Sequence, residues 1–293
     1  MRRPLALLAL AAFVAFDVFL VTVAVRHVGA APPRSDIQQV GASASPSSGR
    51  EVSEQVAFEF KPAQAGLLSV SNRGTVITAV RGTCRGKSGV VRTASADSDL
   101  ETRDVGVRQV LAVRATNDRL VVVGTNDTCG AVQRSSTDGG RTWVDDPEVE
   151  LWHPSASNVR EVVAPGGTGS PPGCTIISLS QVGADFGRVV CADGKLFGSG
   201  NSGRSWVLLG RLDNARVIAF TSFNDGYALA RYQGCAANAF TTDDSGRTWK
   251  PGGCITGDPA RAIAANDTGL TAVVGTPTSL FVSRDKGEGW KQR

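Results

Sequence analysis

The side chains that could do chemistry in this chain are concentrated in one recurring eight-residue pattern. The pattern is Ser/Thr-x-Asp/Asn-x-Gly-x-x-Trp, and its four copies begin at Ser136, Ser199, Thr242 and Ser283. A short carboxylate or carboxamide accepts hydrogen bonds from the backbone N–H groups that follow it, and glycine adopts a positive φ without steric cost. These residues therefore indicate the closing of a tight turn, rather than metal ligation or catalysis.

The copies recur at a nearly constant interval. Their Asp or Asn residues lie 63, 43 and 41 residues apart, and a worn copy at Ser95-Ala-Asp97 lies 41 residues before the first. Asp99 and Thr102 stand in the worn copy where glycine and tryptophan are expected. Self-similarity at about 40 residues is typical of repeat architectures. We assign a structural role to Asp138, Gly140, Trp143, Asn201, Gly203, Trp206, Asp244, Gly246, Trp249, Asp285, Gly287 and Trp290.

The repeat resembles the Asp box, also called the bacterial neuraminidase repeat. This motif is found in β-propellers such as sialidases, sortilin-type receptors and photosystem II assembly factors. Four copies match it well, and together they span most of residues 64–293. The resemblance implies that the box is a structural turn on the propeller face opposite the ligand or active site.

Apolar segments around each box predict the elements that hold these turns. Each repeat offers three strand-like runs before its box and one after it, which predicts four-stranded blades. The expected blades cover 64–104, 106–147, 172–211, 213–253 and 258–293. The expected fold is an all-β propeller of about five blades over residues 56–293, and a sixth, degenerate blade is compatible with the spacing. Val56–Phe60 is expected to complete the last blade and hide its edge.

The N-terminal residues predict a membrane segment. Arg2 and Arg3 precede an apolar run from Leu5 to Val25, which is long enough to cross a bilayer. The basic start favours a cytoplasmic N-terminus and an exported C-terminal domain. We therefore expect a single-pass signal anchor over residues 1–28, with secretion after signal-peptide cleavage as the alternative. Residues 29–55, rich in Ala, Pro and Ser, are expected to form a flexible tether.

About 20 residues between the second and third boxes have no place in the repeat. The stretch 148–171 contains Trp152 and His153 and ends in a Pro/Gly-rich run, which predicts an inserted loop. An aromatic residue in a loop can anchor a partner, and the alternative is that Trp152 covers a seam between blades or plugs the central channel. Arg81 and Arg231 precede cysteines by three and four residues, and they either meet an anion or are solvated strand ends.

Six cysteines in an exported domain predict three disulfides. All six fall at the ends of the expected strands that lie away from the boxes, together with the stretch 148–171. From their neighbourhood in the sequence we expect the pairs Cys84–Cys129, Cys174–Cys191 and Cys235–Cys254.

The chemical inventory favours binding over catalysis. The net charge is +4 with scattered basic residues, which predicts no nucleic-acid surface, and one exported histidine cannot form a His-based metal site. We expect no metal and no cofactor. A sialidase-like glycoside hydrolase is the alternative function, although the Arg-Ile-Pro signature is absent and the chain has only two tyrosines, Tyr227 and Tyr232. The expected function is a membrane-anchored binding or assembly module for an extracytoplasmic protein or a cell-wall glycan.

Overall fold

The computed structural model describes residues 66–146, 151–231, 235, 237–257, 259–269, 271–276 and 279–293. The expected membrane segment 1–28, the tether 29–55 and the strand Val56–Phe60 lie outside the described residues. Within those ranges, no helix is long and apolar enough to cross a bilayer.

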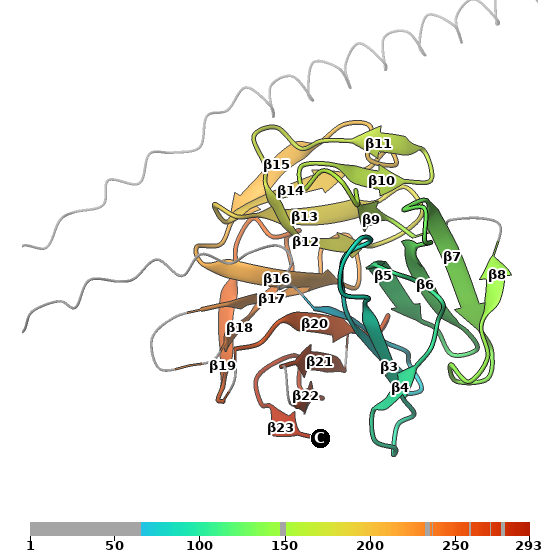
Figure 1. Ribbon diagram of the computed structural model, residues 1–293. Coiled ribbons are helices and arrows are strands. Elements are labelled where there is room, and N and C mark those ends of the chain that lie inside the picture. The colour runs from blue at the N-terminus through green and yellow to red at the C-terminus, as the bar shows by residue number, and fades with distance from the viewer. Residues whose placement is uncertain are drawn as a thin grey trace, which may run out of the picture. The chain divides into compact units, whose positions relative to one another are not determined.

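The described residues form six antiparallel sheets, numbered here as blades 1 to 6 in chain order (Figure 1). Blade 1 contains β1 (Leu67–Val70), β2 (Val76–Val80), β3 (Val90–Ala94) and β4 (Glu101–Arg103). Blade 2 contains β5 (Val110–Ala115), β6 (Leu120–Thr125), β7 (Ala131–Ser136) and β8 (Val144–Asp146). Blade 3 contains β9 (His153–Pro154), β10 (Val162–Ala164) and β11 (Gly167–Gly169).

The last three blades follow the four-stranded plan, as the repeat predicts. Blade 4 contains β12 (Ile176–Gln181), β13 (Gly187–Cys191), β14 (Lys195–Ser199) and β15 (Val207–Arg211). Blade 5 contains β16 (Ala215–Phe220), β17 (Gly226–Ala230), β18 (Ala237–Thr242) and β19 (Lys250–Ile255). Blade 6 contains β20 (Ala262–Ala265), β21 (Ala272–Gly275), β22 (Leu280–Ser283) and β23 (Lys291–Gln292).

The innermost strands close into a ring. Strands β1, β5, β9, β12, β16 and β20 each contact the next, and β20 contacts β1 (Figure 1). The fold is therefore an all-β, six-bladed propeller. The structure confirms the alternative of a sixth, degenerate blade over the expectation of about five, because the residues between the second and third boxes add a blade of their own.

Blade 3 replaces the expected inserted loop. Among the described residues of 148–171, three short strands pair in the order β11-β10-β9, so the loop interpretation is wrong. Val162 pairs with Pro154 on one side and with Gly169 on the other. The sheet has no box turn and contains only short strands, which is why the repeat pattern does not predict it.

Blade 3 also runs in the opposite direction to its neighbours. We call the end of the ring that carries the four box turns the box face and the opposite end the cysteine face. Trp152 Nε1 donates to the carbonyl of Ala184 in the β12–β13 turn at the box face, and Ile176 N donates to Val159 O at the cysteine face, where β12 begins. Strand β9 therefore runs from the box face toward the cysteine face. Because β9 begins at the box face, three strands are enough to bring the chain to the cysteine face, where β12 begins, and a fourth strand is not needed.

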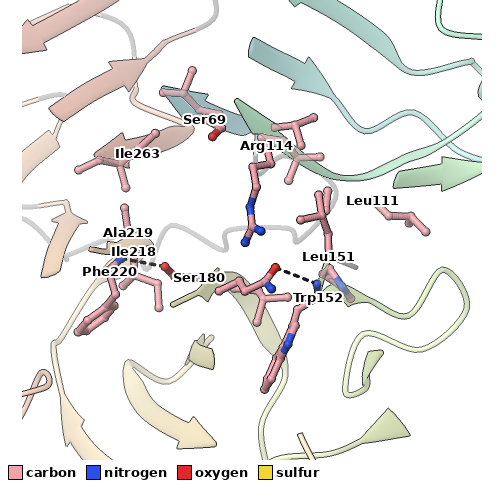
Figure 2. Close-up of a pocket in the computed structure, with 18 of the residues that line it drawn as sticks. Ser69, Leu111, Arg114, Leu151, Trp152, Ser180, Ile218, Ala219, Phe220 and Ile263 are labelled. Carbon is pink, nitrogen blue, oxygen red and sulfur yellow. Dashed lines mark hydrogen bonds between the residues drawn. The ribbon is translucent and has the colours of Figure 1, made fainter. Parts of the chain in front are cut away.

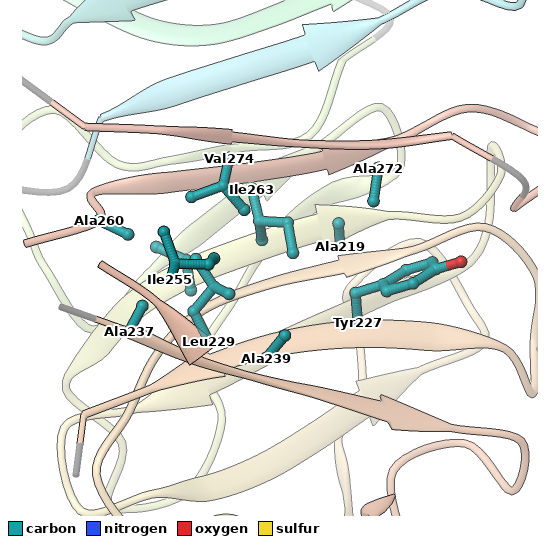
Figure 3. Packing of buried hydrophobic residues seen from close by; sticks show 11 residues of the cluster. Ala219, Tyr227, Leu229, Ala237, Ala239, Ile255, Ala260, Ile263, Ala272 and Val274 are labelled. Carbon is teal, nitrogen blue, oxygen red and sulfur yellow. The ribbon is translucent and has the colours of Figure 1, made fainter. Parts of the chain in front are cut away.

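Apolar side chains fill the seams between the blades. The described residues contain six buried clusters, and each one joins two adjacent blades. Figure 3 shows the cluster between blades 5 and 6, where Leu229 and Ile263 meet. The box tryptophans pack against four of these clusters, each at the seam with the preceding blade; they are Trp143, Trp206, Trp249 and Trp290.

The box turns have the expected geometry between the third and fourth strands. In the first, Gly140 has φ 90°, its N–H donates to Ser136 Oγ at 2.8 Å, and Thr142 N donates to Asp138 Oδ1 at 3.0 Å. The equivalent glycines of the other three turns have φ values of 80°, 85° and 88°. The carboxylates of Asp138, Asp244 and Asp285 and the carboxamide of Asn201 accept hydrogen bonds from backbone N–H groups of their own turns. Their role in the fold is therefore structural.

The worn copy is also a turn, between β3 and β4, but another residue stabilises it. The guanidinium of Arg293 donates to the carbonyls of Ala96 at 2.6 Å and Ser98 at 3.2 Å, and also to that of Ser95. This contact ties blade 6 to blade 1 where the missing glycine and tryptophan leave the turn without its usual stabilisation.

Candidate functional site

A small cavity lies at the centre of the ring. It encloses about 160 Å³ and is lined by residues from or beside all six innermost strands (Figure 2). Most of the lining residues are apolar, with Leu67, Leu151 and Ile263 among them, but polar atoms make up the larger part of the cavity's exposed wall. None of the described residues that line it is Asp, Glu, His or Tyr.

Two arginines bring positive charge to this cavity. Arg114 of β5 projects into the middle of it (Figure 2). Arg81, directly after β2, lines it from the cysteine face and donates from Nη1 to the carbonyl of Leu111 at 3.4 Å. Desolvation by burial lowers the pKa of Arg81 to about 10, and its buried Nε has no hydrogen-bond partner among the described residues. Sequence reasoning identified Arg81 but missed Arg114, which stands in an ordinary strand pattern.

Two serines add hydroxyl groups to the lining. Ser69 Oγ accepts the N–H of Ala115 at 3.0 Å, and Ser180 Oγ accepts that of Phe220 at 2.8 Å. Each bond joins the innermost strands of two adjacent blades, so these serines connect blades as well as line the cavity. A hydroxyl that accepts a bond keeps a hydrogen to donate.

Trp152 lies beside the cavity, and its indole points away from it (Figure 2). The indole donates to Ala184 O at 2.9 Å and packs edge-on against Trp206, with ring centroids 6.1 Å apart. Only 2% of Trp152 is exposed. This burial matches the alternative interpretation given above, in which the side chain packs at the centre of the ring and at a seam between blades. A direct contact between this indole and a partner stays a prediction, and it requires the indole to leave its pocket.

His153 is the second predicted residue of this stretch, and it is also buried, with 3% exposed. Its Nδ1 lies 3.0 Å from the carbonyl oxygen of Pro154, and its Nε2 has no hydrogen-bond partner among the described residues. Burial lowers the pKa of His153, and nearby Arg81 lowers it further against the opposing effect of the Pro154 carbonyl. The structure therefore brings Arg81, Trp152 and His153 close together, next to one cavity.

Arg231 does not belong to this group. It follows β17 as Arg81 follows β2, at the cysteine face, but it is not among the residues that line the central cavity. Its neighbour Arg216 has a pKa that is lowered by burial and by the charge of Arg231. The predicted anion site therefore does not combine Arg81 with Arg231 in this cavity.

The three expected disulfides are confirmed. Their Cα–Cα distances are 5.6 Å for Cys84–Cys129, 5.2 Å for Cys174–Cys191 and 5.7 Å for Cys235–Cys254. Five of the six cysteines lie in loops or at a strand end of the cysteine face, and Cys254 lies one residue before the end of β19 rather than in the connection between blades. The bridge between blades 1 and 2 lies beside Arg81.

A second hollow on the box face was not predicted. It encloses about 410 Å³ between blades 5 and 6, and its lining includes Asp225, Asp243 and Tyr227. Asp225 accepts a hydrogen bond from Ser222 Oγ at 2.6 Å, and Asp243 pairs with Lys250 at 2.5 Å. Turn residues from two blades form it, and no sequence pattern connects them.

Tyr227 is a core residue of that region. Its ring packs in the cluster of Figure 3 and its hydroxyl donates to Gly269 O. Burial raises the pKa of Tyr227, and the charges of Asp225 and Asp285 raise it further. A nucleophilic phenolate needs a lowered pKa, so this environment opposes that role. In the described part of the chain, no three His, Cys, Asp or Glu side chains gather closely enough to hold a metal ion.

Comparisons with known proteins add likenesses of fold. No protein-family model and no curated protein matches the chain. A GH74 enzyme from Niastella koreensis is 13% identical with a TM-score of 0.31, and the match covers 77% of this chain and 47% of the enzyme. YCF48 from Cyanidioschyzon merolae is 14% identical with a TM-score of 0.32 and coverages of 80% and 73%. YCF48 bound to a D1 peptide is 14% identical with a TM-score of 0.29 and coverages of 79% and 83%. This chain therefore spans about half the length of the GH74 enzyme, and these likenesses assign no activity.

Proposed function

We propose that this protein is an Asp-box propeller anchored in a membrane by residues 1–28, and that it binds an extracytoplasmic partner. The partner is a protein or a cell-wall glycan, and the propeller acts as a binding or assembly module on the outer side of the membrane. The recurrence of the boxes supports the family, and the basic N-terminus before a long apolar run supports the anchor.

The central cavity carries the proposal of binding rather than catalysis. Glycoside hydrolysis uses a pair of carboxylates, or in sialidases a tyrosine nucleophile with its activating acid. The described lining of the cavity is made of arginines, serines, Gln181, Trp152, Phe220 and aliphatic side chains, and it contains none of those catalytic groups. The described lining offers its serine hydroxyls no carboxylate or imidazole base that would activate them as nucleophiles, so it suits binding better than catalysis.

The cysteine face is the surface on which we place the partner. The Cys84–Cys129 bridge joins the loop 81–89 of blade 1 to the loop 126–130 of blade 2. Loops that are ordered before binding lose less conformational entropy when they bind. Arg85 and Lys87 are exposed on the first loop, and neither has an acidic partner among the described residues.

A glycoside hydrolase is the second candidate, and the box-face hollow is the observation that favours it. Asp225 and Asp243 both line that hollow, and two carboxylates are the usual catalytic set. We expect no turnover of aryl glycosides or aryl sialosides by the full-length chain. Turnover that is lost in Asp225→Asn and in Asp243→Asn would establish the hydrolase and overturn the binding proposal.

Capture of the partner tests the proposed function. The full-length chain carries an N-terminal tag, which leaves the Arg293 contact intact, and is cross-linked in its own membranes before mass spectrometry. We expect Arg85→Glu with Lys87→Glu to lose the captured partner. The matched control, Arg141→Glu with Arg284→Glu, reverses two exposed charges on the box face and keeps it. If only the control variant lost the partner, the partner would bind at the box face, and the proposed binding at the cysteine face would be wrong.

Peptide mapping under non-reducing conditions tests the topology. Protein purified from membranes is expected to yield the three disulfides, because export exposes these cysteines to an oxidising compartment. Free thiols at several of the six positions would contradict an extracytoplasmic propeller and therefore the orientation of the anchor.

A further inference from the structure

We propose that the segment 57–65 of this chain, with Phe60 as its anchor, docks into the seam between blades 6 and 1 at the cysteine face and closes the ring there. The segment lies outside the described residues, and the groove that receives it lies within them. The inference goes beyond the proposed function, because it assigns an occupant to a second surface and needs no external partner.

An apolar groove opens at the cysteine-face end of this seam. It encloses about 90 Å³, and its lining includes Val80, Val90 and Leu100 of blade 1 and Ala262 and Leu280 of blade 6. Val80 is the last residue of β2 and is 59% exposed. In blades 2, 4, 5 and 6 the second strand is buried along its whole length. The described part of blade 1 is therefore uncovered at a place where these four blades are covered.

The other five seams show which element supplies the cover. In each of them, the connection that enters the next blade contributes a buried apolar residue to the cluster; these residues are Val105, Leu151, Cys174, Leu212 and Ala260. The cluster between blades 6 and 1 contains no residue of this kind among the described ones. Its equivalent would come from the chain that enters blade 1, which is the segment before Gly66.

Gly66 brings that segment to the groove. It is the first described residue, it lines the groove, and its N–H donates to the carbonyl of Arg261 at 3.0 Å. Six residues of extended chain span at most about 20 Å, so Phe60 lies within reach of the whole groove. The cavity volume is far below the roughly 300–1,000 Å³ of sites for drug-sized ligands, which suits a single large side chain.

Charge complementarity supports the same occupant. Arg92 and Arg261 are exposed on the lining of the groove, and the described lining contains no Asp or Glu. Neither arginine has an acidic partner among the described residues. Glu59 directly precedes Phe60. Since successive side chains of an extended segment point to opposite sides, burial of Phe60 leaves Glu59 at the rim, where the two arginines are exposed.

Labelling of an introduced thiol tests whether the groove is covered. Val80 and Val144 are exposed almost equally, at 59% and 61%, so Val80→Cys and Val144→Cys form a matched pair. In the full-length chain in detergent micelles, a maleimide is expected to modify Val80→Cys about tenfold more slowly, because that site reacts only when the segment opens. Equal rates would refute the docking. Peptide mapping of both variants should recover the three native disulfides, which shows that the fold is intact.

A change in the segment identifies what covers the groove. Adding Phe60→Ala to Val80→Cys is expected to raise the labelling rate to that of Val144→Cys, whereas adding Phe60→Leu keeps the rate low. Glu59→Arg should raise the rate in part, and Glu59→Arg with Arg92→Glu should lower it again. If labelling stayed slow with Phe60→Ala, another element would cover Val80 and the role of Phe60 would be wrong.

Oxidative trapping then locates the segment. Phe60→Cys with Val80→Cys is expected to form a fourth disulfide within one chain, and Phe60→Cys with Val144→Cys is the matched control that does not. A bridge between two chains would assign the groove to a second copy and contradict the inference. A bridge in Phe60→Cys with Gln292→Cys, without one to Val80→Cys, would place the segment at the outer edge of blade 6, as the sequence alone suggested.

Discussion

Blades 3 and 5 both pack against blade 4, but they fill the seam with it in different ways. Blade 5 has four strands and a box turn whose Trp249 packs against the seam with blade 4, edge-on to Phe220 at 6.2 Å. Blade 3 has three short strands and no box, and Trp152, just before its first strand, fills the seam with blade 4 instead. Among the described residues, the cluster at the seam between blades 2 and 3 contains no tryptophan, and its buried members are Leu111, Val121, Val123 and Leu151.

The comparison separates the two roles of the box. One role is to close the turn through local hydrogen bonds, and the other is to supply an aromatic side chain to the seam. Blade 3 needs only the second role, because its short strands are linked by a tight turn at Ala164–Gly167 that lies beside Ser202 of the next box. The disulfide Cys174–Cys191 then ties the connection after blade 3 to β13.

The largest effect is expected at Trp152. Trp152→Ala empties a site that is 2% exposed and leaves the carbonyl of Ala184 without its donor, so we expect a loss of about 4–5 kcal/mol in the free energy of unfolding. Denaturant unfolding measures it, and Trp152→Phe is the control that keeps most of the packing. A Trp152→Ala variant that is as stable as the parent but loses the captured partner would restore Trp152 as a binding anchor.

Trp249→Ala is expected to cost less, about 3 kcal/mol, because Trp249 is only partly buried. The folded fraction should still capture the partner, since the box face is opposite the proposed binding face. Unfolding and capture are measured on the same preparation. If Trp249→Ala had normal stability but no longer captured the partner, the box face rather than the cysteine face would be the binding surface.

Gly246→Ala tests the turn without removing the tryptophan. Gly246 has φ 85°, and an added Cβ would lie 2.1 Å from Leu196 Cδ2, so both backbone strain and a clash oppose the substitution. We expect a loss of about 2–3 kcal/mol. Gly139→Ala is the matched control, because Gly139 has φ 77° and nothing within 4 Å of the added Cβ; it should cost about 1 kcal/mol. Equal losses would show that the clash is relieved by movement of Leu196.

The smallest effect concerns pH. Hydrogen bonds from the Thr248 hydroxyl and N–H lower the pKa of Asp244 to about 2, below the unfolded value of about 3.9. A depressed carboxyl pKa stabilises the fold above the unfolded pKa, and this contribution is lost as pH falls from about 4 through about 2. Asp244→Asn should therefore flatten the decline of the denaturation midpoint in that window, and Asn201→Asp should steepen it. An unchanged slope in both variants would contradict the role of the carboxylate charge.

Most of the fold could be predicted because its signals are local. The box turns close through bonds within four residues, as between Thr142 and Asp138, and the flanking valine runs suit strands that are packed on both faces. The disulfides followed, because strand ends at one face place the cysteines near each other in space. Blade 3 escaped prediction because β9 has two residues and no box marks its end.

The sequence by itself determined the turns, four of the six blades in full, the first blade with its worn turn, and the pairing of the cysteines. Only the tertiary structure decided the number of blades, the reversed direction of β9 and the convergence of Arg81 and Arg114. Closing the ring places Arg114 in the central cavity and turns the Trp152 indole into a seam (Figure 2). The physical reason is that a turn is stabilised by neighbours along the chain, whereas a central cavity exists only after six strands, distant in sequence, have met.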